Sequence, residues 1–110
     1  YDVNAFTRIL FESLDERIMN LSPAVKKEYK KLYVAYKLDT NFVDIVFQKQ
    51  RLRISINMKF SEINDPNGIC KDITDLGRWG NGDVELFMEH QDELDQIMEI
   101  VKQSFDAQVE

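Results

Sequence analysis

The chain has 110 residues, of which 44% are hydrophobic and 31% charged, and its formal net charge is −6. These values are typical of one globular domain, and no apolar run approaches the roughly 20 residues that cross a bilayer, so we expect no membrane segment. One cysteine and one histidine cannot form an internal disulfide or the usual Cys/His zinc sites. We therefore expect no metal or other cofactor, and a reducing, cytoplasmic setting.

Two helices are predicted at the start of the chain. Phe6, Ile9, Leu10, Leu14 and Ile18 recur at helical spacing after Asn4, a residue type that often caps helices. The segment "LSPAVKKEYKK", residues 21–31, then predicts a short second helix, because a serine followed by proline is a common helix start.

The spacing of apolar residues changes to alternation after this point, which predicts three consecutive antiparallel strands over 32–38, 42–48 and 51–58. In the third segment, Leu52, Ile54 and Ile56 alternate with arginine and other polar residues. We expect this apolar side to face the core, and Arg51 and Arg53 to lie on the solvent side.

A long connection, 64–82, is rich in Pro, Gly, Asn and Asp, and we expect a helical turn near 71–76. Residues 83–89 alternate as a fourth strand, and Leu94, Ile97, Met98, Val101 and Phe105 mark a closing helix. The predicted fold is α+β: a four-stranded antiparallel sheet, a three-strand meander plus one strand, packed on N- and C-terminal helices.

The motif "GRWGNGD", residues 77–83, holds three of the four glycines and the only tryptophan. It matches neither the dinucleotide nor the P-loop pattern, because no strand precedes it and no helix follows. Glycine permits positive φ, so we expect Gly77, Gly80 and Gly82 to let the backbone fold over a packed Trp79 ring. A ligand-lining role for this ring is the alternative.

No catalytic set is visible in the sequence. The only histidine, His90, is expected at an exposed helix start, and Cys70 has no nearby histidine to activate it, so we expect an inert thiol. Asp44 lies in the second strand without the second carboxylate that a metal-dependent nuclease needs. We expect it to be an exposed carboxylate that pairs with a neighbouring cation, and we expect no enzymatic activity.

Charge is distributed unevenly along the chain. Residues 26–59 carry nine Lys and Arg against three acids, whereas 83–110 carry nine acids and one lysine. A basic middle segment can present one positive sheet face, on which we expect Lys37, Lys49, Arg51 and Arg53 to converge. The alternative is that these are simply the solvated faces of two different elements.

The segments "KKLYVAYKL", "NFVDIVFQKQRLRISIN", "GRWGNGD" and "DELDQIMEIVKQSFD" resemble an uncharacterised bacterial domain family labelled "predicted transport protein". Its members recur at the C-terminal end of chains whose preceding parts look like restriction-type or PD-(D/E)XK nucleases. The family commonly has His at the position of Arg78. The resemblance implies one accessory domain, residues 1–110, from the C-terminal part of a longer chain, as the missing start methionine also suggests.

Two functions follow as expectations. The first is a recognition or docking module of a restriction or defence protein, whose cationic sheet face contacts nucleic acid or other domains of the parent chain, with no membrane contact. The second is a small-ligand sensor with a pocket under the 64–82 loop. We expect that pocket or loop to use Tyr33, Tyr36, Arg78, Trp79 and Asp83.

Overall fold

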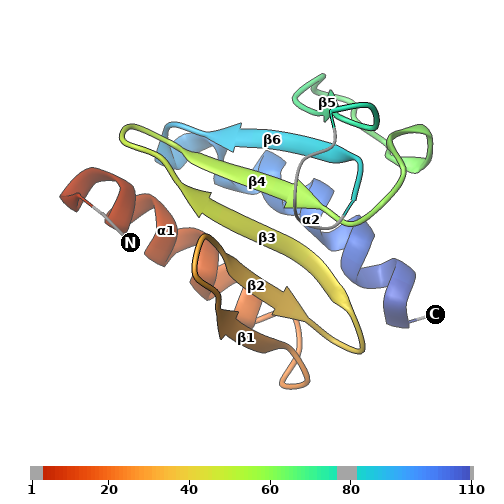
Figure 1. The fold of residues 1–110 in the computed structure, drawn as a ribbon, viewed down its shortest axis with the longest axis horizontal. Helices are drawn as coiled ribbons and strands as arrows, with labels where there is room; N and C mark the ends of the chain where they lie inside the picture. The colour runs from red at the N-terminus through yellow and green to blue at the C-terminus, as the bar shows by residue number, and fades with distance from the viewer. Residues whose placement is uncertain (1–3, 77–81, 110) are drawn as a thin grey trace.

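The computed structural model describes residues 4–76 and 82–109, which form one antiparallel sheet with two helices on the same side of it (Figure 1). The helices are α1 (Ala5–Met19) and α2 (Leu94–Val109). The strands are β1 (Lys26–Tyr29), β2 (Val34–Lys37), β3 (Asn41–Phe47), β4 (Leu52–Ile56), β5 (Lys71–Asp72) and β6 (Val84–Met88). Two short 3₁₀ turns, η1 (Phe60–Glu62) and η2 (Gln91–Glu93), complete the elements.

The six strands pair in the order β1-β2-β3-β4-β6-β5, each antiparallel to its neighbour. The α+β class, the flanking helices and the meander are therefore confirmed. The predicted strand number is wrong, because β1 and β5 extend the sheet at its two edges. Gly77, Arg78, Trp79 and Gly80 of the glycine-rich motif lie outside the described residues.

The predicted second helix is wrong, because Lys26–Tyr29 form the edge strand β1. The peptide N–H groups of Ala24 and Val25 donate to the side chain and the carbonyl of Ser22, at 3.1 and 3.2 Å, which closes a turn instead of starting a helix. The chain then pairs with β2. Good helix formers are thus held in a strand by pairing with a neighbour, a tertiary effect that local propensity does not include.

The helical turn expected near 71–76 is also wrong at its start, where Lys71 and Asp72 form β5. This two-residue strand pairs with Glu85 and Val84, and the peptide N–H group of Ile73 donates to the carbonyl of Asp83 at 2.8 Å. The pairing partner is a dozen residues away, and two residues are too few to produce a recognisable alternation.

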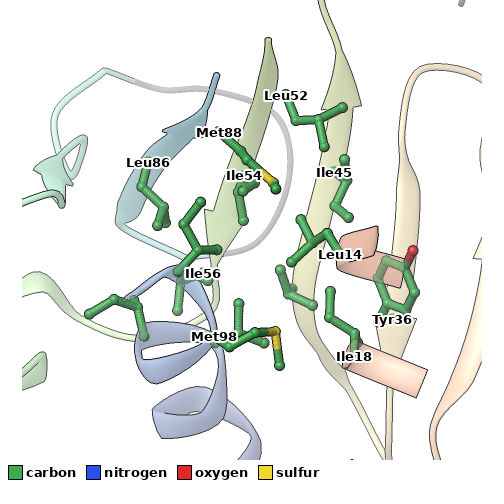
Figure 2. Packing of buried hydrophobic residues seen from close by; sticks show 14 of the residues in the cluster. Leu14, Ile18, Tyr36, Ile45, Leu52, Ile54, Ile56, Leu86, Met88 and Met98 are labelled. Atoms are coloured by element: carbon green, nitrogen blue, oxygen red, sulfur yellow. The ribbon is translucent and has the colours of Figure 1, made fainter. Parts of the chain in front are cut away.

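The core lies between the helices and the sheet (Figure 2). Leu14 and Ile18 of α1 meet Tyr36 and Ile45 of the sheet, while Met98 of α2 lies near Ile56. The following sheet residues are fully buried on this side: Val34, Tyr36, Ile45, Leu52, Ile54, Ile56, Val84, Leu86 and Met88. The alternation predicted for β4 and β6 is therefore confirmed.

The helix α1 begins as predicted, because the Asn4 side-chain oxygen accepts a hydrogen bond from the Thr7 peptide N–H at 2.9 Å. Its buried stripe, however, is Thr7, Leu10, Leu14 and Ile18. Phe6 and Ile9, expected in that stripe, are 47% and 56% exposed. The apolar face of α1 is therefore rotated relative to the predicted one at the first turns.

Gly82 confirms one part of the expectation for the glycine-rich motif. Its φ is +95°, and an added Cβ would overlap the Ile56 carbonyl group of the neighbouring strand β4. Glycine is therefore required here both for its backbone conformation and for the close approach of two chains.

Candidate functional site: the open face of the sheet

The sheet face that α1 and α2 do not cover is named here the open face. The strand register places Ala35, Asp44, Ser55 and Glu85 next to one another across β2, β3, β4 and β6, on the side opposite the core residues. Asp44 is 2% exposed and Glu85 0%, and Ala35 and Ser55 are buried as well. The expectation of an exposed Asp44 is therefore wrong. Its carboxylate accepts a hydrogen bond from the Asn41 side chain at 3.1 Å.

Arg53 lies on the open face, as the alternation in β4 predicts, but it does not lie in solvent. Its side chain is only 15% exposed, and its Nε atom is 3.6 Å from Oε1 of Glu85. A charged pair at this depth loses hydration, which the mutual attraction must offset. The positive charge of Arg53 is therefore matched by an acid on the adjacent strand, and it contributes little to a field outside the protein.

Arg51 forms the second feature of the open face. Its Nε donates to the Gln48 side chain at 2.6 Å, and its guanidinium carbon lies 3.7 Å from the ring centre of Phe87 on β6. A guanidinium above an aromatic face is an attractive cation–π arrangement. The hydrogen bond to Gln48 and the contact with the Phe87 ring together fix the position of this cation at the hairpin between β3 and β4.

Lys37 does not converge with the other three cations, whereas Lys49 and Arg51 line one hollow at the β3–β4 hairpin. Lys37 pairs with Asn41 at the first residue of β3, whereas Lys49 follows the last residue of that strand. A strand of this length separates its two ends by about 20 Å. The Nζ atom of Lys37 is 2.7 Å from Oε1 of Glu28. That hydrogen bond, with the charge of Lys30, holds the pKa of Glu28 below its usual value.

The residues proposed for a pocket under the 64–82 loop are not brought together either. Tyr36 lies on the helix side of the sheet, fully buried, and its hydroxyl donates to Asp15 of α1 at 2.6 Å. Asp83 is half-buried, and its backbone links the residues that follow β4 and β5. Its N–H donates to the Met58 carbonyl at 3.2 Å, and its carbonyl accepts from the Ile73 N–H at 2.8 Å. Tyr33, also half-buried, lies in the turn between β1 and β2. Arg78 and Trp79 lie outside the described residues.

A different pocket is present at the end of the sheet where the β3–β4 hairpin turns. It has a volume of about 460 Å³ and is lined by Asn4, Phe6, Lys49, Gln50, Glu89 and His90. The side chain of Asn4 donates to the carbonyl of Lys49 at 2.6 Å, which ties the start of α1 to the hairpin. One lysine and one glutamate face this pocket, so their charges oppose each other.

The groups with possible chemical reactivity are held in ordinary structural positions. His90 is exposed and precedes η2, where its peptide N–H donates to Glu93 at 2.8 Å. Burial, with the charge and a hydrogen bond of Asp65, raises the pKa of the Cys70 thiol to about 12. Among residues 4–76 and 82–109, no three His, Cys, Asp or Glu side chains are grouped so that they could hold a metal ion. Within the same ranges no helix has the length and apolar character to cross a bilayer.

Two residues of the open face, Glu85 and Phe87, were absent from the expected site. The alternation in "DVELFME" already places them opposite the core residues of β6. Their contacts with Arg53 and Arg51, however, depend on β6 lying beside β4. The two strands are separated by a long connection, so the sequence alone does not predict that they are neighbours in the sheet.

Comparison with known proteins gives a family but no function. Over 103 residues, the chain is 38% identical to an "Uncharacterized protein" of Haemophilus influenzae. The matched region is 94% of this chain and 34% of that relative, so the chain spans about one third of the relative's length. No solved structure matches. The family model described as "Domain of unknown function (DUF5655)" matches residues 2–108, and the chain therefore belongs to this family.

Proposed function

We propose that this domain is a non-catalytic docking module that contacts a partner protein domain through the partly exposed end of the open face, where Arg51 and Phe87 lie. The observation that carries the proposal is the fixed Arg51–Phe87 stack, at 3.7 Å, on a face without a covering helix among the described elements. Arginine and aromatic residues are enriched in the centres of protein interfaces, where a planar cation held in advance loses little entropy on binding. The partially exposed ring and guanidinium offer such a centre.

A protein partner is favoured over nucleic acid because two of the four cations expected on this face are matched by acids. Lys37 is paired with Glu28 and Arg53 with Glu85. Binding to phosphates depends on releasing counterions from several cations at once. With Lys37 about 20 Å from the β3–β4 hairpin and Arg53 paired with Glu85, only Lys49 and Arg51 remain close together to bind phosphates.

The partner that we propose is another domain of a longer chain. The relative of Haemophilus influenzae is about three times as long as the region that it shares with this chain, which supports such an arrangement. The resemblance described above adds that the neighbouring domain is nuclease-like, of the restriction or defence type. Contacts between domains of one chain are typically modest in area and partly polar, in agreement with an arginine-centred surface.

The experiment mixes this domain with the part of the Haemophilus influenzae relative that this chain does not match, expressed separately. We expect association by isothermal titration calorimetry, and about tenfold or greater weakening by Arg51→Ala, the usual loss at an interface centre. Arg17→Ala is the matched control, because Arg17 lies on α1 in an exposed pair with Asp95. The relative's own matched region serves as the positive control. If that region binds its remainder and Arg51→Ala leaves the binding of this domain unchanged, the proposed surface is wrong.

Two further measurements separate the other functions. Binding of a 20-base-pair duplex that falls steeply with added salt, and that is lost in Arg51→Ala, would favour nucleic acid as the partner. Saturable quenching of the single tryptophan, Trp79, by a small metabolite would favour a ligand sensor instead.

A further inference from the structure

The outermost strand of the sheet, β1, has a backbone edge to which no described strand is paired. The strand order begins with β1, so Lys26–Tyr29 pair with β2 on one side only. In the turn that follows, the Lys30 peptide N–H donates to the carbonyl of Tyr33 at 2.8 Å. Since residues of an antiparallel strand alternate in hydrogen bonding, Lys26 and Glu28 face β2. Lys27 and Tyr29 therefore present their N–H and C=O groups to the open edge.

This edge is strongly basic. Lys26, Lys30 and Lys31 are exposed, and the segment 26–31 contains four lysines and one glutamate. The glutamate, Glu28, is already contacted by Lys37 at 2.7 Å and by Lys30 at 3.4 Å. A lysine-rich edge strand is a known device against unwanted strand pairing. Its effect depends on the charge of the incoming strand.

The positive charge of the β1 edge disfavours a second copy of this chain as the added strand and favours an acidic segment. A second copy pairing at the same edge would place lysines opposite lysines, and like charges directly opposite each other destabilise a strand pair. The other edge of the sheet, β5, has only two residues and offers too short a template. An acidic segment, in contrast, would gain opposite-charge contacts at β1 while it pairs with the open N–H and C=O groups.

We propose that the β1 edge binds an extended acidic peptide segment of a partner protein as an additional strand. The proposed partner alternates acidic with apolar residues, because the two sides of β1 differ. On the open-face side, Lys26 and Lys30 would meet the carboxylates. On the helix side, the Tyr29 ring, which is 63% exposed, would meet the apolar residues. This is strand addition, in which the main chain supplies affinity and alternate side chains supply specificity. It uses a surface different from that of the proposed docking function and does not depend on it.

The probe is a fluorescein-labelled eight-residue peptide that alternates Glu with Val, compared with a peptide that has Lys in place of Glu. A third peptide carries N-methyl groups on alternate residues, so that one backbone edge cannot donate hydrogen bonds. We expect the acidic peptide to bind in fluorescence anisotropy, and both control peptides to bind about tenfold more weakly or worse, the equivalent of at least one lost hydrogen bond. Amide signals of Lys27 and Tyr29 should shift in NMR spectra of the labelled domain and gain protection from exchange.

Two variants of the domain test the same idea. Tyr29→Pro removes one N–H group of the open edge and keeps the hydrogen bonds to β2. Binding of the acidic peptide should therefore be lost, while thermal melting shows that the domain is still folded. Lys26→Glu combined with Lys30→Glu should abolish binding of the acidic peptide and permit binding of the lysine peptide. Lys59→Glu with Lys102→Glu is the control with the same change in net charge, on exposed residues of other elements.

The outcomes are distinct. If the acidic peptide does not bind at millimolar concentration, the proposal is wrong. If it binds equally well when N-methylated, or to folded Tyr29→Pro, the contact is only electrostatic and strand addition is excluded. Equal weakening by the control pair of lysine substitutions would mean that net charge, and not this edge, determines binding.

Discussion

The hydrogen-bonded group formed by Asp15, Lys27 and Tyr36 joins α1 to the first two strands, and it permits a sharp test of the packing. The Tyr36 hydroxyl donates to Asp15 at 2.6 Å, and Lys27 Nζ donates to both carboxylate oxygens, at 2.9 and 3.2 Å. The perturbation is Tyr36→Phe, which removes one hydroxyl and retains the fully buried ring.

The expected cost follows from the surroundings of the carboxylate. A hydrogen bond to a charged group contributes about 1.5–3 kcal/mol to stability. Asp15 keeps its bonds to Lys27, and its side chain remains 20% exposed, so water can replace part of what is lost. We therefore expect Tyr36→Phe to lower the free energy of unfolding by about 1–2 kcal/mol. For a domain of this size that corresponds to a decrease in Tm of roughly 4–8 °C.

The assay is urea and thermal unfolding followed by circular dichroism at pH 7, with Tyr29→Phe as the matched control. Tyr29 is 63% exposed, so loss of its hydroxyl should change stability by less than about 0.5 kcal/mol. If Tyr36→Phe is as stable as the wild type within that margin, the bond to Asp15 adds nothing and the reasoning is refuted.

The pH dependence gives an independent check. Burial, and then the hydrogen bond and charge of Asp15, raise the pKa of Tyr36 above its ordinary value. A tyrosine in the unfolded chain ionises near pH 10. The stabilisation is therefore complete below about pH 10 and is lost as the pH rises further, because unfolding then releases a proton. Burial lowers the pKa of Lys27, but the hydrogen bonds and charges of Asp15 and Tyr29 together outweigh it, so this pKa is raised and acts in the same direction. Above about pH 10, the stability of Tyr36→Phe should therefore fall less steeply than that of the wild type.

Two further predictions concern the thiol and the glycines. With a pKa of about 12, the Cys70 thiol should react slowly with iodoacetamide at pH 8 in the folded domain and readily in urea. The substitution Asp65→Asn should speed the reaction of the folded domain. If the Asp65→Asn rate equals that of the wild type, the carboxylate does not contribute to the raised pKa of the thiol. Gly82→Ala should lower the free energy of unfolding by more than about 3 kcal/mol, because it combines a positive φ with overlap on the Ile56 carbonyl. Gly68→Ala, which has a positive φ but open space around the added Cβ, should lower it by about 1–2 kcal/mol. Equal unfolding midpoints for the two glycine variants would contradict this difference.

Those parts of the fold that rest on local pattern could be predicted from the sequence. The Asn4 cap, the stripe of α2 and the alternation in β4 each require only neighbouring residues, and each is found as expected. The strand β1 could not be predicted, because its lysines and glutamate favour helix and only pairing with β2 overrides that preference. The strand β5 is too short to leave a pattern.

The candidate site could likewise be predicted only where it depends on local pattern. Alternation correctly assigned Arg53 to the face opposite the core, yet it could not reveal that Glu85, thirty-two positions later, lies 3.6 Å away. The net charge of a strand face therefore depends on register across the sheet. A count of lysines and arginines along one segment overestimates the positive charge that such a face presents to a partner.

The meeting of the two helices has a consequence for synthesis of the protein. The helix α1 is synthesised before the sheet and α2 after it, yet both cover the same side of the sheet, and Arg17 reaches Asp95 at 2.9 Å. Until α2 has left the ribosome, the apolar side of β3, β4 and β6 has only half of its cover. A nascent chain that stops before Leu94 should therefore remain sensitive to protease, and emergence of the sixteen-residue helix α2 should be the step that makes the domain resistant.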